Sequence, residues 1–180
     1  MIRRTTNGSP VLGIAGWKNS GKTTLAERLT QELTQRGHRI STVKHAHHAF
    51  DIDHPGTDSF RHREAGAQEV LLVSGRRWAM MHELRDEPEP DFNAVLDRLA
   101  PCDLVLVEGY RGEDHPKLEV RRDGARDNSP LPTAPETIIA VVSDTDPAEA
   151  PETKGKPHFA HDSVGEIADF VEDHCELTSR

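Results

Sequence analysis

The chain has 180 residues, a length that fits one domain with at most a small appendage. Its formal net charge is −9 at pH 7, which argues against bulk binding to nucleic acids or to anionic membranes. Its apolar runs fall far short of the ~20 residues that a membrane helix needs, and residues 1–10 hold no apolar run of signal-peptide length. The 2 cysteines match neither a disulfide framework nor a metal-binding spacing, so we expect a cytoplasmic protein.

Apolar periodicity divides the chain into alternating strands and helices. Residues 1–10 are polar and predict a flexible arm, followed by a single domain over residues 11–175. The domain opens with a strand over 11–15, a helix over 22–36 and a strand over 38–44, which together have the size of a βαβ unit. We next expect a short helix over 58–67, a strand over 69–74 with a hairpin partner over 78–82, and a helix over 92–99. Three strands over 104–107, 117–121 and 138–142 and a last helix over 164–171 follow.

This order of elements predicts an α/β protein with a P-loop NTPase-like three-layer fold and a mostly parallel central sheet. In such sheets, ligands bind beyond the carboxyl ends of the strands. The candidate ligand-binding segments are therefore the polar residues that follow the strand ends at Ala15, Lys44, Val107 and Val142.

The strongest motif follows the first strand. Residues 16–23 read Gly-Trp-Lys-Asn-Ser-Gly-Lys-Thr and satisfy the pattern G-x-x-x-x-G-K-[ST] between an apolar run and a helical pattern. Its backbone N–H groups and the helix N-terminus are expected to cradle phosphates, with Lys22 at the β- and γ-phosphates and the Thr23 hydroxyl on Mg²⁺. The alternative is a turn of small residues that happens to end in Lys-Thr.

Two further acidic residues stand at strand ends. Glu108 ends the run at 104–107, where it could bind the metal through water, orient an attacking water, or simply be solvated. Asp144 follows the strand at 138–142 and could accept hydrogen bonds from guanine, although the chain lacks the Asn-Lys-x-Asp motif of many GTP-binding proteins. An acidic turn residue before Pro147 is the alternative for Asp144.

Residues 44–58 are unusually rich in histidine and aspartate. The segment contains His45, His47, His48, His54, Asp51, Asp53 and Asp58. Three interpretations stay open: a transition-metal site, a switch-like loop whose Asp51 or Asp53 approaches Mg²⁺, and a solvated polar loop. The residues Arg61, His62 and Arg63 either extend a positive rim for a second anion or form an exposed helix face.

Five segments, in order along residues 11–145, resemble the MobB family, the molybdopterin-guanine dinucleotide biosynthesis protein B family. The segments are 16–25, 43–48 (Val-Lys-His-Ala-His-His), 51–59 (Asp-Ile-Asp-His-Pro-Gly-Thr-Asp-Ser), 61–67 (Arg-His-Arg-Glu-Ala-Gly-Ala) and 104–111 (Leu-Val-Leu-Val-Glu-Gly-Tyr-Arg). The P-loop alone is unspecific, whereas the two segments between 51 and 67 are much more specific. Thr57 stands where the family pattern has lysine, which puts an anion contact at that position in doubt.

The resemblance implies a homodimeric, GTP-binding protein with weak GTPase activity. It also implies an accessory role for a MobA-type nucleotidyltransferase, which joins GMP to molybdopterin. The resemblance and the motifs together give as candidate nucleotide-binding residues Gly16, Asn19, Ser20, Gly21, Lys22, Thr23, Thr24 and Asp144. They give Lys22 and Glu108 as candidate catalytic residues, and Thr23, Asp51, Asp53 and Glu108 as candidate Mg²⁺ ligands.

Other functions remain compatible with the residues. A metallochaperone GTPase would use the histidine-rich segment, and a small-molecule kinase would use the arginines of residues 111–128 in a lid. A nucleotide-gated adaptor with negligible chemistry is a further alternative. Slow hydrolysis is expected because the sequence shows no evident dedicated catalytic group, although Arg111 and Arg61 could approach from a partner subunit.

Overall fold

A computed structural model describes residues 2–46, 50–122, 129–144, 153 and 155–178. Their contacts form two compact units, one of residues 1–45 with 92–180 and one of residues 46–91. We call them the large unit and the small unit. The single domain expected over residues 11–175 is thus divided between them, because the polar segment after the first βαβ unit leads into elements that mainly contact one another.

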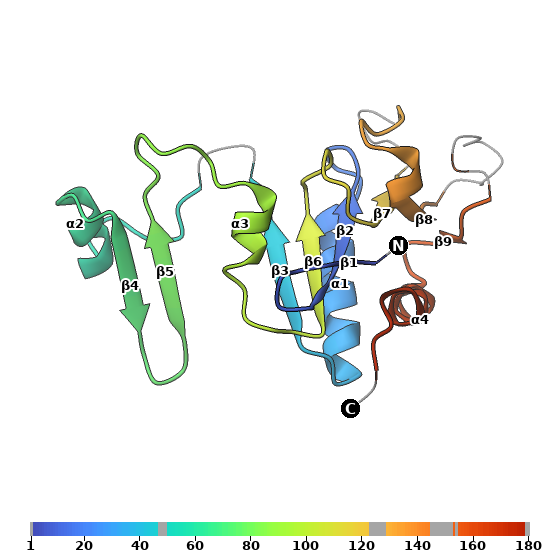
Figure 1. The fold of residues 1–180 in the computed structure, drawn as a ribbon, viewed down its shortest axis with the longest axis horizontal. Helices are drawn as coiled ribbons and strands as arrows, with labels where there is room; N and C mark the ends of the chain where they lie inside the picture. The colour runs from blue at the N-terminus through green and yellow to red at the C-terminus, as the bar shows by residue number, and fades with distance from the viewer. Residues whose placement is uncertain (1, 47–49, 123–128, 145–152, 154, 179–180) are drawn as a thin grey trace. The chain divides into compact units, whose positions relative to one another are not determined.

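The large unit is built on a seven-stranded sheet with the order β3-β6-β2-β7-β8-β9, while β1 pairs with β2 (Figure 1). The strands are β1 (Arg3–Arg4), β2 (Pro10–Ala15), β3 (Ile40–Lys44), β6 (Leu104–Glu108), β7 (Lys117–Val120), β8 (Ile138–Val142) and β9 (His158–Phe159). All pairs along this order are parallel, and the β1–β2 pair is antiparallel. The predicted mostly parallel α/β fold is confirmed.

Helices cover both faces of this sheet. On one face, α1 (Lys22–Gln35) and α4 (Val164–Cys175) pack on alternate residues of β2, including Leu12 and Ile14. The leucines of α1 at 25, 29 and 33 are buried there, as their spacing predicts. On the other face, α3 (Phe92–Leu96) packs on Val11. Burial on both faces explains why the central strands are almost continuously apolar.

The ends of the chain depart from the expectations. Residues 1–10 predict a flexible arm, yet Arg3 and Arg4 pair with β2, and the Thr5 N–H donates to the Ser9 carbonyl at 2.9 Å. The Ser9 hydroxyl also accepts from the Cys102 N–H at 3.0 Å. The short η1 (Pro135–Thr137) and β9 are additional elements, which are too short to produce a sequence pattern.

The small unit contains α2 (Asp58–Glu64) and the antiparallel hairpin of β4 (Glu69–Val73) and β5 (Trp78–His82). The hairpin is confirmed as predicted. The Thr57 hydroxyl caps α2 by accepting a hydrogen bond from the Phe60 N–H. Among the described residues, no helix has the length and hydrophobicity needed to cross a membrane.

Candidate functional site

The loop of residues 16–23 joins β2 to α1 and has a backbone that requires glycine. Gly21 has φ 98° and Asn19 has φ 68°, so the chain turns through the left-handed region at both positions. A Cβ atom on Gly16 would collide with the Val120 carbonyl oxygen and the Ser20 hydroxyl. The loop therefore closes tightly against β7, which forms its back wall.

Polar groups inside this loop are left available for an anion. Ser20 is 1% exposed, and its buried hydroxyl has no hydrogen-bond partner among the described residues. The Gly21 cap supplies no side-chain hydrogen bond to the start of α1, where the first N–H groups of a helix lack intrahelical partners. An orphaned hydroxyl, free amides and a helix N-terminus are the groups that bind phosphate.

Lys22 extends along the loop. Its ammonium donates to the Trp17 carbonyl oxygen at 2.7 Å. Burial lowers the pKa of Lys22; Glu108 opposes this effect, and the positive charges of Arg111 and Lys44 add to it. The cation is thus held beside the backbone of the loop. Its contact with the outer phosphates stays a prediction of the motif.

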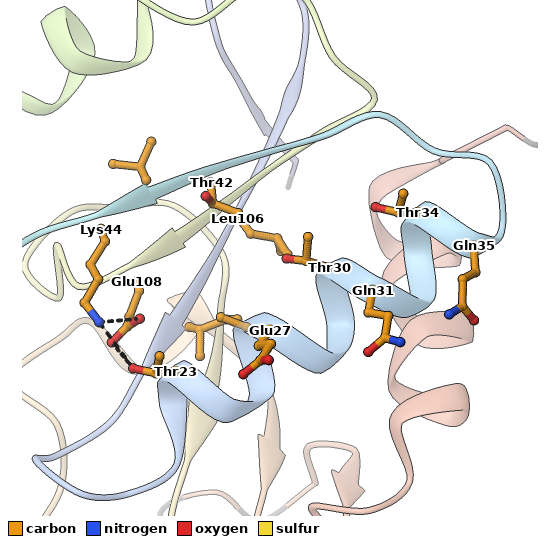
Figure 2. A pocket seen from close by; sticks show the side chains of 13 residues that line it. Thr23, Glu27, Thr30, Gln31, Thr34, Gln35, Thr42, Lys44, Leu106 and Glu108 are labelled. Atoms are coloured by element: carbon orange, nitrogen blue, oxygen red, sulfur yellow. Dashed lines mark hydrogen bonds and ion pairs between the residues drawn. The ribbon is translucent and has the colours of Figure 1, made fainter. Parts of the chain in front are cut away.

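A carboxylate, a hydroxyl and an ammonium group meet at the first turn of α1 (Figure 2). The Thr23 hydroxyl donates to Glu108 Oε1 at 2.9 Å, and Lys44 Nζ lies 3.3 Å from Glu108 Oε2 and 3.3 Å from Thr23 Oγ1. These residues come from α1, β6 and β3. The oxygen atoms of Thr23 and Glu108 are of the type that Mg²⁺ prefers, so the predicted pair of metal ligands fits this ion.

Lys44 was not among the predicted site residues. It ends β3 in direct register with Glu108 on the neighbouring parallel strand β6. The only sequence signal was its place at the carboxyl end of a strand, because the strand order that joins β3 to β6 is not encoded locally.

A pocket of about 660 Å³ begins at this group of three and runs along α1 (Figure 2). Its apolar lining includes Ile14, Val43 and Leu106. Its polar lining comes from α1, including Thr30 and Gln31, and from the ends of β3 and β6. Solvent can therefore reach Thr23, Lys44 and Glu108 through the pocket that runs along α1.

The remaining predicted nucleotide-binding residues lie on the same edge of the sheet. Thr24 is exposed in the first turn of α1. Asp144 follows β8, and its Oδ2 lies 3.9 Å from His161 Nε2. Gly21 and His161 are also neighbours, since a Cβ atom on Gly21 would lie 3.3 Å from His161 Cε1. The guanine contact of Asp144 stays a prediction.

Asp51 and Asp53 belong to the small unit and have partners there. Arg63 Nη1 lies 2.9 Å from Asp51 Oδ1 and 3.5 Å from Asp53 Oδ2. The hydrogen bond from Arg63 holds the pKa of Asp51 below its usual value. Asp53 Oδ1 also accepts from the Thr57 hydroxyl at 2.8 Å. Arg63 is thus engaged in ion pairs within the small unit, and the metal-binding role of both aspartates stays a prediction.

The histidine-rich segment is only partly described. His47 and His48 lie outside the described residues. Within the part that the structure describes, no group of three or more His, Cys, Asp or Glu side chains is placed to hold a metal ion. His45 instead stacks on the Tyr110 ring, with 4.6 Å between the ring centroids.

The sheet order, the glycine-closed loop and the helix that starts from it define a protein of P-loop NTPase-like fold. The family described as molybdopterin guanine dinucleotide synthesis protein B, MobB, matches residues 11–144. The chain therefore belongs to the MobB family.

Individual relatives agree with this assignment. The chain is 41% identical over 137 residues to the molybdopterin-guanine dinucleotide biosynthesis adapter protein of Escherichia coli (strain K12), covering 75% of this chain and 78% of that protein. It is 39% identical over 166 residues to the protein of the same name from Haemophilus influenzae, covering 92% and 89%. The crystal structure of Bacillus subtilis MobB has the same fold, with a TM-score of 0.74 over 95% of this chain and 99% of that chain, at 23% identity.

Proposed function

We propose that this protein is a GTP-binding, weakly GTP-hydrolysing adapter that assists the transferase attaching GMP to molybdopterin. Family membership supports the general part of this role, an adapter protein of molybdopterin-guanine dinucleotide biosynthesis, which is the name of its E. coli and H. influenzae relatives. The MobA-type transferase, molybdopterin and a homodimeric state are proposed on the resemblance described above.

The observation that carries nucleotide binding is the loop of residues 16–23. Gly16 is closed against β7, the buried Ser20 hydroxyl has no partner among the residues that the structure describes, and α1 starts without a side-chain cap. Loop amides and Lys22 would bind the phosphates of the nucleotide. Thr23 and Glu108 would hold Mg²⁺, which neutralises phosphate charge when bound.

Weak hydrolysis follows from the state of Glu108. Its two carboxylate oxygens are engaged by the Thr23 hydroxyl and the Lys44 ammonium. A carboxylate held in this way is suited to fixing charge and a metal ion rather than to accepting a proton from an attacking water. We therefore propose that nucleotide binding, more than turnover, serves the adapter role.

A competition experiment tests the proposal. Calorimetry with GTP, GDP and ATP, with and without Mg²⁺, should show guanine-nucleotide binding that Lys22→Ala weakens at least about tenfold, because a charge-assisted phosphate contact is lost. GMP transfer to molybdopterin should then be measured with a MobA-type transferase, with and without this protein. Unchanged binding in Lys22→Ala would contradict the role of the loop, and transfer that is indifferent to the protein would contradict the adapter role.

A further inference from the structure

An arginine of the same chain lies on the phosphate loop. The chain leaves β6 through Gly109 and Tyr110, which have φ angles of 105° and 48°. The Tyr110 ring contacts the rings of His45 and Phe92, with 4.6 Å between the centroids of each pair. These contacts hold the turn that Arg111 follows.

The Arg111 side chain rests on Trp17, the second residue of the loop. Arg111 Cζ lies 4.8 Å from the centroid of the Trp17 ring, which is the geometry of a cation–π contact. The indole is itself fixed, because Trp17 Nε1 donates to the Ser129 carbonyl oxygen at 2.7 Å. The guanidinium is thus positioned by a loop residue rather than left free in solvent.

Lys22, Lys44 and Arg111 bring three positive charges near the Glu108 carboxylate. Burial has the largest effect on the pKa of Lys22 and lowers it, Glu108 raises it, and Arg111 and Lys44 lower it. Arg111 has no carboxylate partner within the described part of the chain. The Glu108 carboxylate is shared with Lys44. A polyphosphate would supply the missing negative charge.

We propose that Arg111 contacts the terminal phosphate of a nucleoside triphosphate bound to the loop of its own chain, and that Trp17 positions the guanidinium for this contact. The inference rests on the proposed function and adds a residue that distinguishes triphosphate from diphosphate. Lys22 reaches the β- and γ-phosphates by its place in the motif. Lys22 and Arg111 both contact Trp17, Lys22 at its carbonyl oxygen and Arg111 at its ring. A planar guanidinium suits bidentate contact with phosphate oxygens.

The affinity ratio between triphosphate and diphosphate tests this role. We expect Arg111→Ala to weaken binding of GTP and of a non-hydrolysable GTP analogue about 10- to 100-fold and binding of GDP less than about threefold. Arg111→Lys keeps the charge but loses the planar fork, so the GTP affinity should recover only in part. Arg98→Ala, which removes an exposed arginine in the turn after α3, is the matched charge control and should leave both affinities unchanged.

The positioning role of Trp17 needs its own variants. Trp17→Ala should reduce the ratio of GTP to GDP affinity, and Trp17→Phe should restore most of it, because an aromatic face is enough for the guanidinium. In a Trp78→Phe background, Trp17 is the remaining tryptophan, and its fluorescence should change more on binding GTP than on binding GDP. This difference should disappear in Arg111→Ala.

The outcomes separate the two proposals. If Lys22→Ala loses nucleotide binding but Arg111→Ala keeps the wild-type ratio of GTP to GDP affinity, the role of Arg111 is overturned and the proposed function stands. Equal losses of GTP and GDP affinity in Arg111→Ala also overturn it, because they indicate a general effect on the loop. If the wild-type protein binds neither nucleotide, the proposed function fails first and this inference fails with it.

Discussion

Lys44 and Glu108 end two adjacent parallel strands in direct register, and Lys44 Nζ lies 3.3 Å from Glu108 Oε2. The Thr23 hydroxyl completes the group by donating to the other carboxylate oxygen. A carboxylate that would hold a metal ion is thus preoriented by a helix on one side and an edge strand on the other. Its geometry depends on the consecutive elements α1 and β3 and on β6, which is distant from both in sequence.

Replacing Glu108 by glutamine should separate metal dependence from phosphate binding. We expect the Mg²⁺-dependent gain in GTP affinity to fall about tenfold, because an amide oxygen is a weaker and uncharged metal ligand. Calorimetry at several Mg²⁺ concentrations measures this gain. Glu27→Gln, which removes an exposed carboxylate lining the same pocket, should leave it unchanged. An equal effect of both variants would contradict a specific role for Glu108.

A methyl group at position 16 should disrupt the phosphate loop. Gly16→Ala pushes a Cβ atom into the Val120 carbonyl and the Ser20 hydroxyl, so we expect a loss of about 1–3 kcal/mol in the free energy of unfolding together with a loss of nucleotide binding. Chemical denaturation and calorimetry measure the two effects. Gly75→Ala is the matched control, since nothing lies within 4 Å of the added atom. A Gly16→Ala protein with normal stability and GTP affinity would show that the loop is more open than described.

His115 should contribute to acid unfolding. It is fully buried, and burial, followed by the charges of Lys117 and Arg3, lowers its pKa to about 3. The folded state therefore resists protonation that the unfolded state accepts near pH 6.5, so stability should fall as the pH drops from about 6.5 toward 3. The contribution of this group is on the order of 5 kcal/mol by linkage.

Comparison with His115→Phe separates the loss of stability caused by protonation of His115 from the loss caused by protonation of carboxylates at low pH. The wild-type protein should lose more stability than the variant between pH 6.5 and 4 in urea unfolding series. Parallel curves for the two proteins would show that His115 is protonated equally in both states.

The cap of α2 should depend on a single hydroxyl. Thr57→Ala removes the hydrogen bond to the Phe60 N–H and the contact with Asp53, so we expect a loss of about 1 kcal/mol in the local stability of residues 58–64. Amide hydrogen exchange of these residues measures it. Thr57→Ser keeps the hydroxyl and should retain most of the protection; equal exchange in both variants would argue against the cap.

The parts of this site that the sequence predicted are those with a local signal. The loop of residues 16–23 has a fixed spacing, and α1 has leucines at helical intervals. The Lys44–Glu108 pair depends on strand order, and the Arg111–Trp17 contact depends on a tertiary turn, so neither has a local pattern. The ion pairs of Asp51 and Asp53 with Arg63 likewise have no pattern in the sequence that identifies them.

The buried polar residues show the same limit. Lys117 and His115 are fully buried although their residue types favour the surface. They fit because Gly13 on the paired strand has no side chain: a Cβ atom there would lie 2.5 Å from His115 Nε2 and 2.8 Å from Lys117 Cγ. A glycine within a strand is typical of a close approach by another group, but it does not identify that group.

The contact between Gly16 and the Val120 carbonyl also defines how short a working fragment of this protein can be. The loop begins after residue 15, yet the atom that closes it from behind is supplied by β7, more than half of the way along the chain. A truncated protein that stops at the end of β6 would retain the whole G-x-x-x-x-G-K-T motif and lack that support. We therefore expect peptides or truncated chains chosen by motif boundaries alone to bind nucleotide more weakly than the intact chain.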